Sequence, residues 1–253
     1  TSVIIPNSVT SIGSGAFNEC SSLTSVVIPD SITTIESSVF ASCSNLTSIS
    51  IPNSVTIIGI HAFRSCYNLA SITIPNSVTN ISQQAFLYCS ALSSISFPES
   101  ITTIGLESFV GCSALTSITI PSSLTSIGER AFRNCTSLTS VTSFLTTPLT
   151  INANVFNNAN ISNATLYVPV GSQSAYQVAP VWQDFGSNQG FSPATHLNFD
   201  GVDDFVNIGS VVATGASYTK EVMIKPNAIT GSYNILSSAG DVFWISNNQI
   251  RAG

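Results

Sequence analysis

A strict 23-residue period constrains the fold of this chain more than any other feature of its sequence. Six cysteines recur at this interval, and a proline and a phenylalanine keep the same spacing. The cysteines are Cys20, Cys43, Cys66, Cys89, Cys112 and Cys135. The unit reads L-T-S-I-x-I-P-x-S-V-T-x-I-G-x-x-A-F-x-x-C-x-x. A period in this range predicts a solenoid, in which each unit forms one coil and stacking buries a core that no single coil can bury.

Each unit begins with residues that predict a short strand. Leu23, Val26 and Ile28 have the L-x-x-L-x-L spacing of leucine-rich repeats, which points alternate side chains inward. Pro29 ends the strand because proline has no N–H for the ladder. The hydroxyl of Ser31 is expected to hydrogen-bond turn backbone. The sequence thus predicts a leucine-rich-repeat solenoid whose parallel strands form one sheet face.

The second part of each unit predicts a helical turn. Ala16, Phe17 and Cys20 have the spacing of one such turn with an apolar inner face. The phenylalanine is the largest side chain of this group, so we expect it to be the main buried anchor of every coil.

The equally spaced cysteines have four interpretations. Equivalent residues of neighbouring coils lie about 4.8 Å apart, so the thiols can form an interior column of small apolar groups. Disulfides fit this spacing poorly, since a bridge needs Cβ atoms about 3.8 Å apart. Zinc sites usually need paired Cys or Cys/His spacings, which are absent. A catalytic thiol has no evident partner base. We therefore predict buried, reduced thiols.

The composition argues against two classes of protein. The chain has 6 Lys and Arg against 12 Asp and Glu, so it lacks the basic surface of a nucleic-acid binder. Its mean hydropathy is +0.38, but no run approaches the roughly 18 apolar residues of a spanning helix. The sequence predicts no nucleic-acid partner and no membrane span.

No catalytic motif is evident, and we predict that the protein is not an enzyme. P-loop, G-x-G-x-x-G and H-E-x-x-H patterns are all missing. His196 has no nucleophile motif near it. His61 is expected to lie on the outer surface, because the equivalent position varies between repeats. Its predicted counterparts are Gly15, Ser38, Gln84, Ser108 and Arg130.

The outward positions of the predicted strands are candidates for ligand binding. They carry hydroxyl groups and almost no charge, and the central ones are Ser48, Ser50, Ser71, Thr73, Ser94, Ser96, Ser117 and Thr119. One interpretation is that these residues only keep a sheet face soluble. Another is contact with an extended partner through many weak hydrogen bonds. A third, binding of ice or crystalline polysaccharide, is disfavoured by the curvature of a solenoid.

The repeat closely resembles the BspA-type leucine-rich repeats of bacterial and protist surface proteins, as "LTSITIPSSLTSIGERAFRNC" (115–135) illustrates. The segment "ATLYVPVGSQSAYQVAPVWQDF" (164–185) resembles the closing segment of such arrays. We therefore assign 1–143 to regular repeats and 144–187 to a degenerate last repeat with a C-terminal cap. The resemblance implies an extracellular or cell-surface location and a role in adhesion or ligand capture.

The remaining residues have a different pattern. "GSNQGFSPA" predicts a linker over 188–194, and "HLNFDGVDDFVNIG" predicts a hairpin. From about 195 to 253 the sequence resembles the first strands of a laminin-G-like (concanavalin A-like) jelly roll. That stretch is short for such a domain and the chain opens part-way into a repeat, so we expect a piece of a longer protein.

A calcium site is one interpretation of the carboxylates in this hairpin, and no other cofactor is predicted. Asp200, Asp203 and Asp204 offer the oxygen ligands that calcium prefers. The competing interpretation is a polar turn that one of these residues initiates.

Two functions follow. The first is a non-catalytic adhesion or interaction protein that binds an extracellular protein or polysaccharide through the solenoid. The alternative is a carbohydrate-directed module of a larger secreted protein or enzyme, with the jelly roll binding glycan and the solenoid acting as a spacer.

Overall fold

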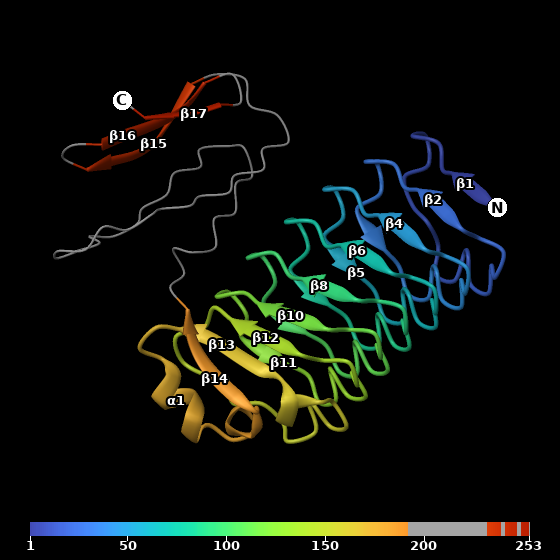
Figure 1. The fold of residues 1–253 in the computed structure, drawn as a ribbon. Coiled ribbons are helices and arrows are strands. Elements are labelled where there is room, and N and C mark those ends of the chain that lie inside the picture. The colour runs from blue at the N-terminus through green and yellow to red at the C-terminus, as the bar shows by residue number, and fades with distance from the viewer. Residues whose placement is uncertain (192–231, 239–240, 247–248, 253) are drawn as a thin grey trace. The chain divides into compact units, whose positions relative to one another are not determined.

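The computed structural model describes residues 1–191 and three strand segments, 232–238, 241–246 and 249–252. The chain divides into two units, Thr1–Phe191 and Ser192–Gly253. The first unit is a solenoid of stacked coils with parallel strands along its length (Figure 1). The leucine-rich-repeat fold class predicted from the 23-residue period is confirmed.

The first strand of every coil joins a row of parallel strands. Ser48 pairs with Ser71 and Ile49 with Ile72, so the pairing register equals the sequence period. The row is divided into two sheets, one from β1 to β6 and the other from β8 to β14. Its strands are β1 (Ser2–Ile4), β2 (Ser25–Val27), β4 (Ser48–Ser50), β6 (Ser71–Thr73), β8 (Ser94–Ser96), β10 (Ser117–Ile120), β12 (Ser140–Ser143), β13 (Thr165–Pro169) and β14 (Ser187–Phe191).

A second row of parallel strands lies on another side of the coils. Each of these strands has two residues, and the second, an isoleucine in every case, points into the core. The strands are β3 (Thr34–Ile35), β5 (Ile57–Ile58), β7 (Asn80–Ile81), β9 (Thr103–Ile104) and β11 (Ser126–Ile127). In the five coils from β2 to β11, two strands on different sides enclose the core between them.

The third side of each coil consists of successive turns, so the predicted helical turn is wrong. Ser38 has φ 58° and His61 has φ 59°, which no helix contains. In this conformation alternate N–H groups point along the stack: the Phe40 N–H donates to Ala62 O at 2.9 Å. The intervening N–H groups close turns within the coil, as when Ala41 donates to Ser38 O at 3.1 Å. Hydrogen bonds to the next coil therefore replace those of a helix.

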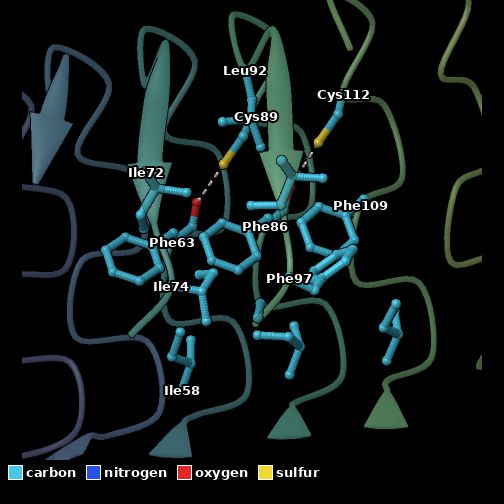
Figure 2. Close-up of a cluster of buried hydrophobic side chains, with 14 of the residues drawn as sticks. Ile58, Phe63, Ile72, Ile74, Phe86, Cys89, Leu92, Phe97, Phe109 and Cys112 are labelled. Atoms are coloured by element: carbon cyan, nitrogen blue, oxygen red, sulfur yellow. Dashed lines mark hydrogen bonds between the residues drawn. The ribbon is translucent and has the colours of Figure 1, made fainter. Parts of the chain in front are cut away.

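The phenylalanines of successive coils stack on one another in the core (Figure 2). The ring centroids of Phe63 and Phe86 are 5.2 Å apart with an interplanar angle of 7°, and those of Phe86 and Phe109 are 5.1 Å apart at 6°. The rings of the inner coils are fully buried, which confirms them as anchors. Phe17, in the first of the described coils, is half-buried.

The cysteines form the predicted interior column, and all six are free. Each inner thiol donates a hydrogen bond to the phenylalanine carbonyl of the preceding coil; Cys89 Sγ reaches Phe63 O at 3.1 Å (Figure 2). Burial raises the pKa of the Cys66 thiol to about 12. Cys20 differs from the others in being half-buried. The thiolate, the reactive form, is therefore suppressed in the inner coils.

We expect native protein at pH 8 to expose one reactive thiol to a disulfide reagent such as DTNB. That thiol is Cys20, because the other five are buried and their carbonyl hydrogen bonds hold the protonated form. Unfolding without reductant is expected to release all 6 thiols. Cys20→Ser should abolish the reaction of the native protein. Fewer than 6 thiols after unfolding would contradict the packing interpretation.

The serine that follows each strand ties one coil to the coil before it. Ser77 Oγ donates to Val55 O at 2.5 Å and Ser100 Oγ to Val78 O at 2.6 Å. The prediction that Ser31 bonds turn backbone is confirmed, with Val9 O of the preceding coil as the acceptor at 2.6 Å. These buried or half-buried bonds repeat with the same geometry along the array.

A cap closes the C-terminal end of the phenylalanine stack. It comprises η1 (Ile161–Asn163), β13, α1 (Gln173–Val178), η2 (Trp182–Asp184) and β14. The rings of Trp182 and Phe185 meet Phe156 edge to face, at centroid distances of 6.1 Å and 5.5 Å. Trp182 Nε1 donates to Leu149 O at 2.8 Å, and Tyr176 donates to Leu145 O at 3.0 Å. The irregular segment thus covers the last coil.

The predicted linker over 188–194 needs correction. Strand β14 includes residues 188–191 and pairs with β13, for example Tyr167 with Gln189. Parallel pairing with the cap satisfies the backbone of a segment whose Gly and Ser content is typical of a loop. The division between the two units falls after Phe191.

In the C-terminal unit, the structure describes a three-stranded antiparallel meander. Its strands are β15 (Ser232–Ser238), β16 (Asp241–Ser246) and β17 (Gln249–Ala252). Three consecutive strands do not identify a jelly roll, so the laminin-G-like assignment of 195–253 is not established. The predicted hairpin, His196 and the calcium candidates Asp200, Asp203 and Asp204 lie outside the described residues.

Candidate functional site

The outward side chains of the first row of strands form one continuous surface, which we call the strand face. It brings together the eight predicted binding residues on four adjacent strands, β4, β6, β8 and β10. Those of β4, β6 and β8 are exposed, and Ser117 and Thr119 on β10 are half-buried. Neighbouring strands are about 4.8 Å apart, so the hydroxyls repeat at that interval across the face.

The eight predicted hydroxyls of the strand face differ from several other hydroxyls of the solenoid, which bond the preceding coil. Thr116 Oγ1 donates to Ser93 O at 3.0 Å, and Thr102 Oγ1 to Thr79 O at 3.2 Å. By contrast, within residues 1–191 none of the eight predicted binding residues has a side-chain hydrogen bond to the protein. Their donors and acceptors are therefore available to solvent or to a ligand.

Other residues of the strand face were missed by the sequence reasoning. In the cap, Tyr167 pairs with Thr142 on one side and with Gln189 on the other, which extends the face by two strands. At the opposite end the face becomes aliphatic, with Ile4 75% exposed and Val27 56% exposed. The cap residues were missed because the strand spacing there departs from 23, although the alternation of "TLYVP" was a signal.

The variable outer position forms a column of polar side chains on the turn side, the polar column. His61 Nε2 donates to Gln84 Oε1, Gln84 Nε2 donates to Glu107 Oε2 at 2.5 Å, and Arg130 donates to Glu107 Oε1 at 3.2 Å. The predicted member Ser108 is wrong: the fifth repeat supplies Glu107, and Ser108 is fully buried with no partner for its hydroxyl. The side chains of the polar column are hydrogen-bonded to one another, so they offer a ligand fewer free donors and acceptors than the strand face does.

The hydrogen bond from Gln84 lowers the pKa of Glu107, aided by Arg130, while burial opposes the shift. A carboxyl whose folded pKa lies below its unfolded value stabilises the protein above the unfolded pKa, near 4.3, and loses that contribution as the pH falls through the folded pKa.

Glu107→Gln is therefore expected to lower the free energy of unfolding at pH 7 by about 0.5–1 kcal/mol, because a half-exposed ion pair is screened by water. The deficit should be smaller at pH 3, which lies below the unfolded pKa, and should vanish once the pH lies below the folded pKa. Urea midpoints at both pH values test this, with the exposed Glu19→Gln as the control. A deficit of the same size at pH 3 and pH 7 would show that the charge of Glu107 is not its cause.

Among the described residues, no metal site and no catalytic group is evident. No group of three or more His, Cys, Asp or Glu side chains among them has a geometry that could hold a metal ion. The one histidine in 1–191, His61, is bonded to Gln84 rather than to a nucleophile.

None of the helices described has the length and apolar character required to cross a membrane.

Comparison with known proteins gives one family match. The family described as BspA type leucine rich repeat region matches residues 1–115 and 56–176, in 6 copies. These two matches together cover more than half of the chain. No curated protein matches.

Several solved structures are similar. A leucine rich repeat protein of T. pallidum is 26% identical with a TM-score of 0.48, and the match covers 67% of this chain and 71% of that one. A leucine-rich repeat protein from Bacteroides ovatus is 24% identical with a TM-score of 0.44, covering 76% and 61%. The pneumococcal vaccine antigen PcpA is 17% identical with a TM-score of 0.48, covering 76% and 55%.

Proposed function

The chain belongs to the BspA-type leucine-rich repeat family, and from this premise we propose that it is a non-catalytic interaction protein at the cell surface or outside the cell. The strand face binds its partner, and the repeats set the length of that face. The unbonded hydroxyls of Ser48, Ser71, Ser94 and their neighbours carry the proposal. Elsewhere in the solenoid, hydroxyls such as those of Ser100 and Thr116 bond the preceding coil, whereas these remain free for a ligand.

The chemistry of the strand face determines how it binds. It has no charged side chain among its predicted binding residues, so contacts there are neutral hydrogen bonds, each contributing about 0.5–1.5 kcal/mol. Useful affinity therefore requires many coils at once, which favours an extended partner. Screening by salt acts on charges, so affinity should change little between low and physiological ionic strength.

A fourfold substitution tests the proposal. Changing Ser71, Thr73, Ser94 and Ser96 together to Lys should abolish binding of the partner while leaving the fold intact, since all four side chains are exposed. A matched control places four lysines on exposed residues outside the strand face, at Asn53, Asn76, Gln83 and Thr136. Binding by surface plasmon resonance and folding by circular dichroism are compared for both variants.

Two results would contradict the proposal. If the strand-face variant folds and binds as the wild type does, the strand face is not the site, and the spacer alternative with a binding C-terminal unit is favoured. If both variants lose binding equally, the added charge is responsible rather than its position.

A further inference from the structure

The strand face lacks the side chains on which protein partners depend. Interfaces between proteins draw most of their binding energy from a few large anchors, chiefly Trp, Tyr and Arg, whereas Ser and Thr are under-represented among them. From β2 to β12 the outward residues are Ser and Thr, with Val27 as the exception. These side chains are small and similar in size, and none of them is an anchor of the kind that protein interfaces use. The composition is unfavourable for a protein–protein interface.

The same composition suits a ligand made of repeated neutral units that carry hydroxyls. A Ser or Thr hydroxyl both donates and accepts a hydrogen bond, and a sugar hydroxyl does the same, so the two can pair in either direction. The absence of charge removes any requirement for ionic groups on the ligand. The regular interval of about 4.8 Å between strands offers the same contact again at every coil.

The cap supplies an aromatic anchor at one end of this surface. Tyr167 is half-buried, lies between Thr142 and Gln189, and its hydroxyl has no partner among the described residues. An aromatic ring presents an apolar face against which the C–H face of a sugar ring can pack. The exposed carboxamide of Gln189 adds a donor and an acceptor beside that ring.

We infer that the partner is a neutral polysaccharide, bound as a single soluble chain along the strand face with Tyr167 as its anchor. The inference rests on the proposed function, which makes the strand face the binding surface. It adds the chemical class of the ligand and the residue where binding is strongest.

The dimensions of the face give this inference a quantitative signature. The nine strands from β1 to β14 span about 40 Å across the coils. Each added sugar makes further contacts without a new association cost, so affinity rises with chain length. The rise should level off once the extended ligand exceeds about 40 Å.

The test uses the full chain and a fixed set of probes. Dextran, pullulan, laminarin and yeast mannan are the neutral polysaccharides, alginate and heparin the anionic ones, and gelatin the extended protein. Affinity electrophoresis and calorimetry are expected to show binding to at least one neutral polysaccharide. Tyr167→Ala should weaken that binding about tenfold, and Tyr167→Phe should retain most of it. Tyr67→Ala, which removes an exposed tyrosine on the turn side, is the matched control.

The outcomes separate this inference from the proposed function. If only gelatin binds and the fourfold lysine variant abolishes it, the strand face is a binding surface but the polysaccharide inference is wrong. If a neutral polysaccharide binds the fourfold variant as well as the wild type, both are wrong. If no probe in the neutral set binds, or if Tyr167→Ala and Tyr67→Ala weaken binding equally, the inference is overturned.

Discussion

Phe86→Ala is expected to destabilise the solenoid by about 3–5 kcal/mol and to divide its unfolding into two transitions. The Phe86 ring is fully buried and stacks on Phe63 and Phe109, so its removal leaves a cavity between two coils. Pairing in the first row of strands is already interrupted between β6 and β8. Phe86 lies on the stretch of chain that joins these two strands. The coils before and after it should then unfold separately.

Urea and thermal unfolding, followed by circular dichroism and by calorimetry, measure both effects. Phe86→Leu is the control for size, because it keeps most of the apolar volume and should lose less stability without splitting the transition. Thr79→Ala, at an exposed position of the same coil, should change little. One transition with an unchanged midpoint for Phe86→Ala would contradict the anchoring role of the phenylalanine stack.

Trp182→Ala should have an effect of similar size, located in the cap. Trp182 is the largest fully buried side chain of the described protein, and its loss is expected to cost about 3–5 kcal/mol. It would also leave Leu149 O without its hydrogen bond. The cap should unfold first and uncover the rings behind it. Self-association is then expected, because a terminal coil needs a polar outer face to remain soluble.

Thermal unfolding and light scattering after size exclusion distinguish these effects. Trp182→Phe keeps an aromatic ring but loses the N–H and part of the buried volume, so it should cost less stability than Trp182→Ala. It should remain monomeric at the concentrations where Trp182→Ala self-associates. If Trp182→Ala melts as the wild type does and does not associate, the cap is not what terminates the stack.

The sequence predicted the regular part of this fold because the period and the pairing register are the same quantity. A 23-residue repeat places Ile49 beside Ile72 and Cys66 beside Cys89, and these columns then determine which side chains are buried. The turn side was predicted wrongly because a helical turn and a series of stacked turns share the same apolar spacing. Ser38 and His61 adopt positive φ although neither is glycine, since their N–H groups gain partners in the next coil.

For the candidate site, alternation along the strand was enough to place Ser71 and Thr73 on the outer surface. It could not show that their hydroxyls have no protein partner, because Thr102 and Thr116 have the same chemistry and are bonded. Tyr167 was missed for another reason: alternation places it on the outer surface, but its register depends on how the irregular cap pairs with β12.

The hydrogen bonds between successive coils also have a mechanical consequence. Serine and cysteine side chains and alternate turn N–H groups of each coil bond the coil before or after it, as Ser77 bonds Val55 and Cys89 bonds Phe63. Tension applied at the two ends therefore loads the boundaries between coils in series, and these boundaries yield one at a time. Each coil that yields releases 23 residues, which extend by about 80 Å. A tether built in this way lengthens in equal steps under load, and the coils that have not yielded keep their shape.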